Sequence, residues 1–132
     1  MTTFIVATNS VHASASICDY LDDRLAGDDV VHAVNSLPGG DETTAEDVRD
    51  GEEALNVVSV RLVATATVET HQFVRGNDAA EDVLAAADNF EADEIVLAVR
   101  KRSAADKLLF GSVAQRVLVD ADIPVVAVPR ST

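Results

Sequence analysis

A cluster of basic side chains is the feature of this sequence best suited to binding chemistry. Four of the ten lysines and arginines fall within the eight positions from Arg100 to Lys107. Gly111 and Ser112 follow, and they are typical of a helix start, where free N–H groups and the positive end of the helix dipole attract anions. The combination predicts a site for an anion such as a phosphate group. The alternative interpretation is a solvated basic loop that pairs with neighbouring carboxylates.

Metal and thiol chemistry have weaker signals in this chain. The three histidines, His12, His32 and His71, lack the spacing that is typical of metal ligands. We therefore expect no metal site. Cys18 is the one cysteine, so no internal disulfide is possible, and its place on the inner face of a predicted helix indicates a core residue.

Nucleophilic catalysis has no support in the sequence. Ser10 and Ser112 are hydroxyls near the predicted anion site, but no histidine or lysine is placed beside them as a general base. No carboxylate is placed to orient an attacking water molecule, so slow ATP hydrolysis is also unsupported. We expect a binding protein and not an enzyme, with Ser112 capping a helix and contacting phosphate.

Apolar runs and helical periodicities alternate along the chain and predict the elements that hold these residues. Strands are expected at 4–8, 29–34, 68–74, 94–99 and 124–128, and helices at 12–26, 50–62, 77–89 and from 111 onward. Strands that are apolar throughout are typical of a parallel sheet covered on both faces. Right-handed crossovers then give one α/β domain over residues 1–132. Its sheet is expected to be open, five-stranded and parallel, with order 3-2-1-4-5, and doubly wound with helices on both faces.

Three further segments have signals of their own. The stretch from Leu37 to Arg49 contains Pro38-Gly39-Gly40 and an acidic run without periodicity, so a loop is expected there. Asp50 to Glu53 resembles a capping box that would start the next helix. Pro124 and Pro129 bracket the last strand, which indicates an edge or intersubunit position.

The strand order locates the anion site. In open α/β sheets ligands bind outside the carboxyl ends of the strands, where the strand order reverses. For the order 3-2-1-4-5 this point lies between the first and fourth strands. Thr8-Asn9-Ser10 and Ala98 to Arg102 are expected to meet there, with the helix start at Gly111 close by.

The same segments resemble the universal stress protein family. The residues that carry the resemblance are Ile95 to Ser103, Lys107 to Leu118, Ala121 to Val128 and Arg75 to Ala80. The combination of Gly-Ser-Val-Ala-x-x-Val-Leu with Ile-Pro-Val-Val is specific, and only the loop from 37 to 49 lacks a counterpart. The resemblance implies an adenine nucleotide α-hydrolase-like fold and a regulatory module that binds ATP or AMP, with Mg²⁺.

The resemblance also implies the site residues. The nucleotide-binding residues carried over to this chain are Ala7, Thr8, Asn9, Val34, Ala98, Val99, Arg100, Lys101, Gly111, Ser112 and Val113. Nucleotide-binding members carry Gly-x-x-Gly, nine residues, then Gly-Ser or Gly-Thr. Ala98 and Lys101 replace the first two glycines here, and Asn9 stands where an aspartate is typical.

Two functions therefore stay open at this point. The first is a stress-response module that binds ATP or AMP at the ends of the first and fourth strands. The second is a dimeric interaction or adaptor protein of the same fold that binds no nucleotide and acts on an unidentified protein partner. In either case the apolar strand from Pro124 to Val128 predicts a homodimer, because an unpaired edge of this kind otherwise aggregates.

The charge balance excludes some partners. Asp and Glu total 23 against 10 Lys and Arg, a net charge of −13, so nucleic acids and anionic membranes are repelled. No signal peptide or membrane span is expected, and the predicted location is the cytoplasm. The Asp-rich surface with only two lysines resembles salt-adapted proteins such as those of haloarchaea, in which salt screens the repulsion between carboxylates.

This charge pattern predicts that folding needs salt. Refolding in molar KCl is expected to yield the native protein, and refolding in low salt is expected to leave part of the chain unfolded, as measured by circular dichroism. Equal stability with and without KCl would contradict the salt-adapted interpretation.

Overall fold

The computed structural model describes residues 1–74, 76–102, 107–109 and 111–130, and for residues 101, 102 and 107–109 it describes the backbone. The strands are β1 (Thr3–Ala7), β2 (Val30–Leu37), β3 (Thr67–Val74), β4 (Glu94–Arg102), β5 (Lys107–Leu109) and β6 (Val125–Arg130). The helices are α1 (Val11–Leu21), α2 (Ala45–Leu62), α3 (Ala79–Asn89) and α4 (Ser112–Asp120), with a short 3-10 turn η1 (Gly40–Glu42). Among these elements, no helix is long and apolar enough to cross a membrane.

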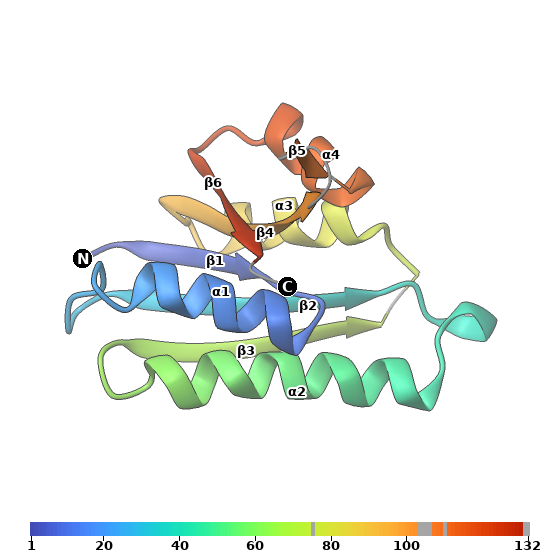
Figure 1. Ribbon diagram of the computed structural model, residues 1–132, viewed down its shortest axis with the longest axis horizontal. Helices are drawn as coiled ribbons and strands as arrows, with labels where there is room; N and C mark the ends of the chain where they lie inside the picture. The colour runs from blue at the N-terminus through green and yellow to red at the C-terminus, as the bar shows by residue number, and fades with distance from the viewer. Residues whose placement is uncertain (75, 103–106, 110, 131–132) are drawn as a thin grey trace.

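The parallel strands lie in the order β3-β2-β1-β4-β6 (Figure 1), which confirms the predicted 3-2-1-4-5 sheet. β1 is central and ends with Ala7 beside Val34 of β2 and Leu97 of β4. The carboxyl ends of β1, β2 and β4 therefore share one edge of the sheet, and the strand order reverses at β1.

Alternating residues of the strands supply two separate cores. Phe4, Val6 and Val31 face α1 and α2, whereas Ile5 and Ile95 face α3 and α4. Residues 3–6 of β1 and 95–97 of β4 are buried because both faces are covered there, which is why these strands are apolar without alternation. The residues of β3 and β6 are half-buried or exposed. The first core also contains Cys18, whose burial raises the pKa of its thiol to about 11, so the predicted core role of Cys18 is confirmed.

β4 is longer than the sequence indicates. It continues three residues beyond Val99, to Arg102, and returns as the antiparallel strand β5. Arg100 pairs with Arg130 of β6 and with Leu109 of β5, so the two partner strands lie along opposite edges of β4 at this residue. β5 thus continues the edge that β1 occupies nearer the start of β4. The expected basic loop is in its described part a β-hairpin.

The start of α2 corrects the prediction for residues 37–49. β2 extends through Leu37, and α2 begins at Ala45 instead of near Asp50. The capping box is formed by Thr44 and Asp47: the Thr44 hydroxyl accepts from the Asp47 N–H at 3.1 Å, and the Asp47 carboxylate accepts from the Thr44 N–H at 3.0 Å. The first turns of α2 are exposed, so no apolar periodicity marked them in the sequence.

Gly51 lets α2 approach the sheet closely. A Cβ atom at this position would lie 2.1 Å from Oδ1 of Asn35 and 2.6 Å from Nε2 of Gln72. Asn35 is only 2% exposed, so its amide has no space into which it can retreat. The close approach aligns Gln72 to donate to the Val48 carbonyl of α2 at 3.0 Å and to Asn35 Oδ1 at 3.1 Å.

The substitution Gly51→Ala is expected to destabilise the protein by about 1–3 kcal/mol, because the new methyl group displaces the buried Asn35 amide and breaks its hydrogen bonds. The matched control is Gly27→Ala, where no atom lies within 4 Å of the added Cβ. That variant is expected to stay within about 0.5 kcal/mol of the parent. Urea unfolding of both variants in molar KCl provides the measurement, and an equal effect of the two substitutions would contradict the close-approach argument.

Candidate functional site

The candidate site is the edge formed by the carboxyl ends of β1, β2 and β4. The Thr8 N–H donates to the Val34 carbonyl at 3.0 Å and so extends the pairing of β1 with β2 by one residue. The Thr8 hydroxyl lies 2.7 Å from the Ser14 hydroxyl, which in turn donates to the Ala54 carbonyl of α2 at 2.7 Å. Thr8 is only 5% exposed. Its side chain therefore joins β1 to both helices of one face and is not available to a ligand.

Asn35 fixes the backbone at the same point. Its Nδ2 donates to the Thr8 carbonyl at 3.0 Å, and its Oδ1 accepts from Gln72 of β3. The buried amide therefore joins the ends of β1, β2 and β3. Sequence analysis missed Asn35 as well as Ser14 and Gln72. A polar residue within an apolar strand was the available signal, because a buried amide needs partners.

Asn9 and Ser10 lead from this fixed point into α1. Asn9 is exposed, whereas the half-buried Ser10 caps the helix: its hydroxyl accepts from the Ala13 N–H at 3.1 Å. The first turn of α1 contains no acidic residue. The Asn9 amide is thus the solvent-facing polar group of this turn, next to the positive end of the α1 dipole.

The β4 side of the edge holds the residues that replace the family's loop glycines. Ala98 and Val99 pair with Val128 and Pro129 of β6, and Arg100 is exposed. Lys101 pairs with Leu108 across the hairpin, and its side chain lies outside the described residues. Ala98 and Lys101 therefore occupy strand positions, where side chains are accepted without the left-handed backbone that glycine permits.

The N-terminus of α4 is open to solvent. Gly111 is the N-cap residue, with φ −65° and ψ 167°, and among the described residues no side chain caps the helix. The prediction that Ser112 caps α4 is wrong, since Ser112 is the first residue of the helix; its side chain is exposed. Val113 is half-buried and packs against the core cluster that contains Val99. The helix thus presents uncapped N–H groups.

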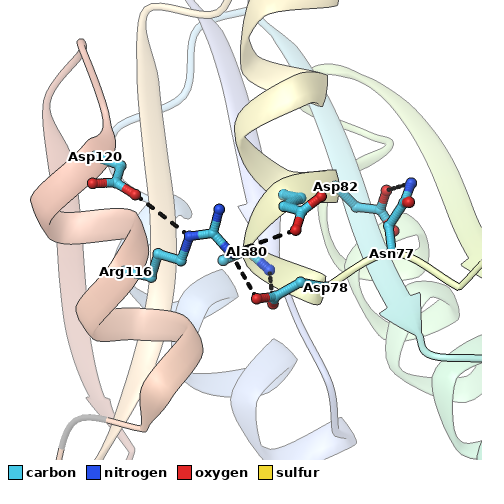
Figure 2. A network of polar contacts seen from close by, with 7 residues as sticks. Asn77, Asp78, Ala80, Asp82, Arg116 and Asp120 are labelled. Atoms are coloured by element: carbon cyan, nitrogen blue, oxygen red, sulfur yellow. Dashed lines mark hydrogen bonds and ion pairs between the residues drawn. The ribbon is translucent and has the colours of Figure 1, made fainter.

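Arg116 links α4 to the start of α3 (Figure 2). Its guanidinium donates to the Asp78 carboxylate at 2.7 Å and, within α4, to Asp120 at 3.4 Å. Asp78 is also the N-cap of α3 and accepts from the Ala80 N–H at 3.0 Å. The contact orients α4 relative to α3, and so helps to place the open N-terminus of α4.

The buried Asp82 anchors the loop that precedes α3. Asp82 is 1% exposed, and its carboxylate accepts from the Ser36 hydroxyl at 2.6 Å and from the Asn77 amide at 3.1 Å. Ser36 lies near the end of β2, so this carboxylate holds the loop against the carboxyl edge of the sheet.

Two histidines that the sequence separates by 39 residues meet on the sheet. The Nδ1 atom of His32 on β2 lies 3.0 Å from Nε2 of His71 on β3, and 3.9 Å from Oε2 of Glu69. The Phe90 ring stacks on both imidazoles, with centroid distances of 3.9 Å to His32 and 4.9 Å to His71. Burial holds the pKa of His32 below its ordinary value, although the Glu69 carboxylate acts in the opposite direction. Sequence spacing gave no signal for this cluster, because it forms only through the parallel pairing of β2 with β3.

Two surface hollows lie away from the carboxyl edge. One, of about 200 Å³, lies between the ends of α3 and α4 and the start of β4, with Glu91 and Ile123 in its lining. The other, of about 310 Å³, lies between α2 and β3, with Glu52 and Thr70 in its lining. Neither contains a predicted nucleotide-binding residue.

The structure brings most of the predicted site residues to one edge. Ala7, Thr8 and Val34 are joined by the β1–β2 pairing, and Ala98 and Val99 follow the β4 residue that pairs with Ala7. The exposed members of this group in the described part of the chain are Asn9 in the turn after β1, Arg100 at the end of β4, and Gly111 and Ser112 at the start of α4. An anion at this edge would meet backbone N–H groups and one or more guanidinium groups.

Comparison with known proteins identifies relatives over almost the whole chain. The model of the universal stress protein family matches residues 4–129. The structure of a universal stress protein from Archaeoglobus fulgidus is 33% identical, with a TM-score of 0.77 over 97% of this chain and 98% of that chain. A structure of the A. fulgidus universal stress protein in complex with dAMP is 28% identical, with a TM-score of 0.70 over the same shares of the two chains.

A curated relative gives a shorter match. A universal stress protein of Mycolicibacterium smegmatis is 47% identical over 53 residues, which are 40% of this chain and 41% of the relative. The aligned part thus spans well under half the length of that relative. The family match and the A. fulgidus structures extend over the two helical layers, the sheet order and the carboxyl edge described above. The chain therefore belongs to the universal stress protein family.

Proposed function

We propose that this chain is a nucleotide-responsive binding module that takes AMP or ATP, the latter with Mg²⁺, at the carboxyl edge of its sheet. The observation that carries the proposal is the exposed N-terminus of α4 at Gly111 and Ser112, which no described side chain caps and where Val113 packs against the cluster that contains Val99 of β4. A phosphate group fits a helix end of this kind, because its charge meets free N–H groups and the helix dipole. The dAMP complex of the A. fulgidus relative supports the same class of ligand.

The other proposed contacts are to the adenine base at one end of the site and to the phosphates at the other. The adenine base would lie against the backbone at the ends of β1 and β2, at Ala7 and Val34, and near the exposed Asn9, whose amide offers both a donor and an acceptor. Arg100 would add charge to the phosphate end, with Gly111, Ser112 and Val113 supplying helix N–H groups. The Mg²⁺ ion would accompany ATP through its phosphates, which is the usual mode of Mg²⁺ binding.

The proposal assigns no catalytic step to the protein. The hydroxyls of Thr8, Ser10 and Ser14 already bond to backbone or to one another. They hold the edge in place, and their hydrogen bonds in the described part of the chain are with backbone groups and one another instead of with a base. Nucleotide binding is therefore proposed as a signal that the protein reports to a partner, which places its role in regulation.

A carboxylate at the start of α4 is expected to weaken AMP binding by at least about tenfold, since it sets like charges side by side at the phosphate position. The variant is Ser112→Asp, which is exposed and favourable for the helix dipole. The matched control is Ala45→Asp, at the same position of α2 and equally exposed. Isothermal titration in molar KCl is expected to show unchanged AMP affinity for this control, and unchanged adenosine affinity for Ser112→Asp.

Titration of the parent protein with AMP, and with ATP and Mg²⁺, tests the site itself. If neither AMP nor ATP with Mg²⁺ binds the parent protein down to millimolar affinity, the edge is not a nucleotide site. The interaction protein without nucleotide then becomes the better account of this fold.

We also propose a homodimer through the strand from Pro124 to Val128. β6 pairs with β4 on one side, and the Pro124 carbonyl accepts from the Ile95 N–H at 3.0 Å. Because successive residues of a strand direct their N–H and C=O groups to opposite edges, those of Val125 and Ala127 point away from β4. They form an apolar, unpaired edge in the described part of the chain, which a second copy would satisfy.

Light scattering at working salt is expected to give a mass of two chains for the parent and of one chain for Ala127→Pro. The substitution removes one outward N–H group and is compatible with an edge strand, where the chain already carries Pro129 at the equivalent alternation. Circular dichroism checks that the variant is folded. A monomeric parent, or a folded Ala127→Pro variant that stays dimeric, would contradict this interface.

A further inference from the structure

We propose that His32, Glu69 and His71 form a site for a divalent transition-metal ion, with Zn²⁺ as the best-matched ion. The site lies on the face of the sheet covered by α3, and no part of the nucleotide proposal depends on it. One ligand atom from each of the three side chains lies within 4.8 Å of the other two. Two imidazoles and one carboxylate are a donor set that zinc accepts readily, with a water molecule completing the coordination.

The distances fit one ion. Two ligand atoms held 2.0–2.1 Å from a tetrahedral zinc ion lie about 3.3 Å apart. The separations from Nδ1 of His32 are 3.0 Å to Nε2 of His71 and 3.9 Å to Oε2 of Glu69, one slightly below and one slightly above this value. The three ligand atoms all lie within 4.8 Å of one another, so rotations of the His71 and Glu69 side chains would close the site around an ion.

The backbone supports this arrangement from two adjacent strands. His32 and Glu69 are direct partners in the parallel β2–β3 register, and His71 is two residues further along β3 on the same face. His32 is 6% exposed, and the Phe90 ring stacks on it nearly parallel, at 7°. This packing restricts the rotation of the His32 imidazole, so one ligand is fixed before the ion arrives.

The other two ligands give access from solvent. β3 is at the end of the sheet order, His71 is half-buried, and the Glu69 side chain is 57% exposed. An ion can thus enter past Glu69 and meet the two imidazoles behind it. On binding, the N–H···N hydrogen bond between the rings is replaced by two metal bonds, and the donor imidazole moves its proton to its other ring nitrogen. No net loss of a proton is required.

The donor set also indicates which ions are excluded. Imidazole nitrogen favours Zn²⁺, Co²⁺, Ni²⁺ and Cu²⁺, whereas Mg²⁺ and Ca²⁺ prefer oxygen ligands. This difference separates the site from the acidic surface of a chain with net charge −13, which attracts every divalent cation.

The test is a titration of the nucleotide-free protein with Zn²⁺, and in parallel with Co²⁺, in KCl with excess Mg²⁺. One equivalent of Zn²⁺ is expected to bind, and Co²⁺ is expected to show the visible absorption of a low-symmetry site with nitrogen ligands. His71→Gln and Glu69→Gln are each expected to lower the Zn²⁺ affinity by at least about tenfold, since loss of supporting groups alone costs 10–100-fold. His12→Gln, an exposed histidine on α1, is the matched control and is expected to leave the affinity unchanged.

Thermal unfolding gives a second readout, and neither readout requires a substitution of the buried His32. Zn²⁺ is expected to raise the unfolding temperature of the parent and of His12→Gln, and not that of His71→Gln. The proposal is overturned if the parent binds no equivalent of Zn²⁺ in excess Mg²⁺. It is also overturned if His71→Gln and Glu69→Gln bind Zn²⁺ as tightly as the parent, which would mean that surface carboxylates hold the ion.

Discussion

The hydrogen bond from the Asn35 side chain to the Thr8 carbonyl is the interaction on which the functional edge of this protein depends. It lies where the central strand ends and the sheet order reverses, and it is buried among three strands and α2. Removing one partner would leave a buried polar group unsatisfied, at a cost of about 1–3 kcal/mol. Gly51 leaves room for the Asn35 amide, and Gln72 on the end strand β3 donates the second hydrogen bond, to its Oδ1 atom. A helix contact, three strand ends and the turn into α1 therefore share one small network.

That network divides the edge into a fixed part and an open part. The Thr8 and Ser14 side chains use their hydrogen bonds to hold β1 against α1 and α2, and the Ser10 hydroxyl caps α1. Solvent meets the Asn9 amide, Arg100 and the uncapped start of α4. Arg116 and Asp78 orient α4 from outside. This division is what a binding module needs: rigid backbone under the ligand, with exposed N–H groups and positive charge above it.

The sequence predicted the sheet well because burial on both faces makes the inner strands β1 and β4 apolar over most of their length, and such runs are visible locally. β3, at the end of the sheet, is half-buried or exposed and carries mostly polar residues. The same reasoning led to the candidate site, because the strand order itself determines where that order reverses. Sequence patterns did not reveal elements made of exposed polar residues, or side-chain contacts between residues far apart in the sequence. The start of α2 is marked only by the Thr44-x-x-Asp47 capping box, which has no apolar periodicity around it. β4 continues through Arg100 and Lys101 because β5 pairs with these residues, although their charged side chains are not typical of a buried strand. His32 and His71 come together only through the register of β2 with β3. The Asn35 amide fits against α2 only because position 51 is a glycine.

The central claim, that an adenine nucleotide occupies the carboxyl edge with its phosphate at the start of α4, is tested most directly by mapping AMP on the backbone amide spectrum of the protein. The account predicts that the amide signals of Asn9, Ser112 and Val113 shift on titration, while those of Glu52 and Asn56 beside the α2–β3 hollow stay in place. Shifts confined to that hollow or to the α3–α4 hollow, with the start of α4 unaffected, would contradict it.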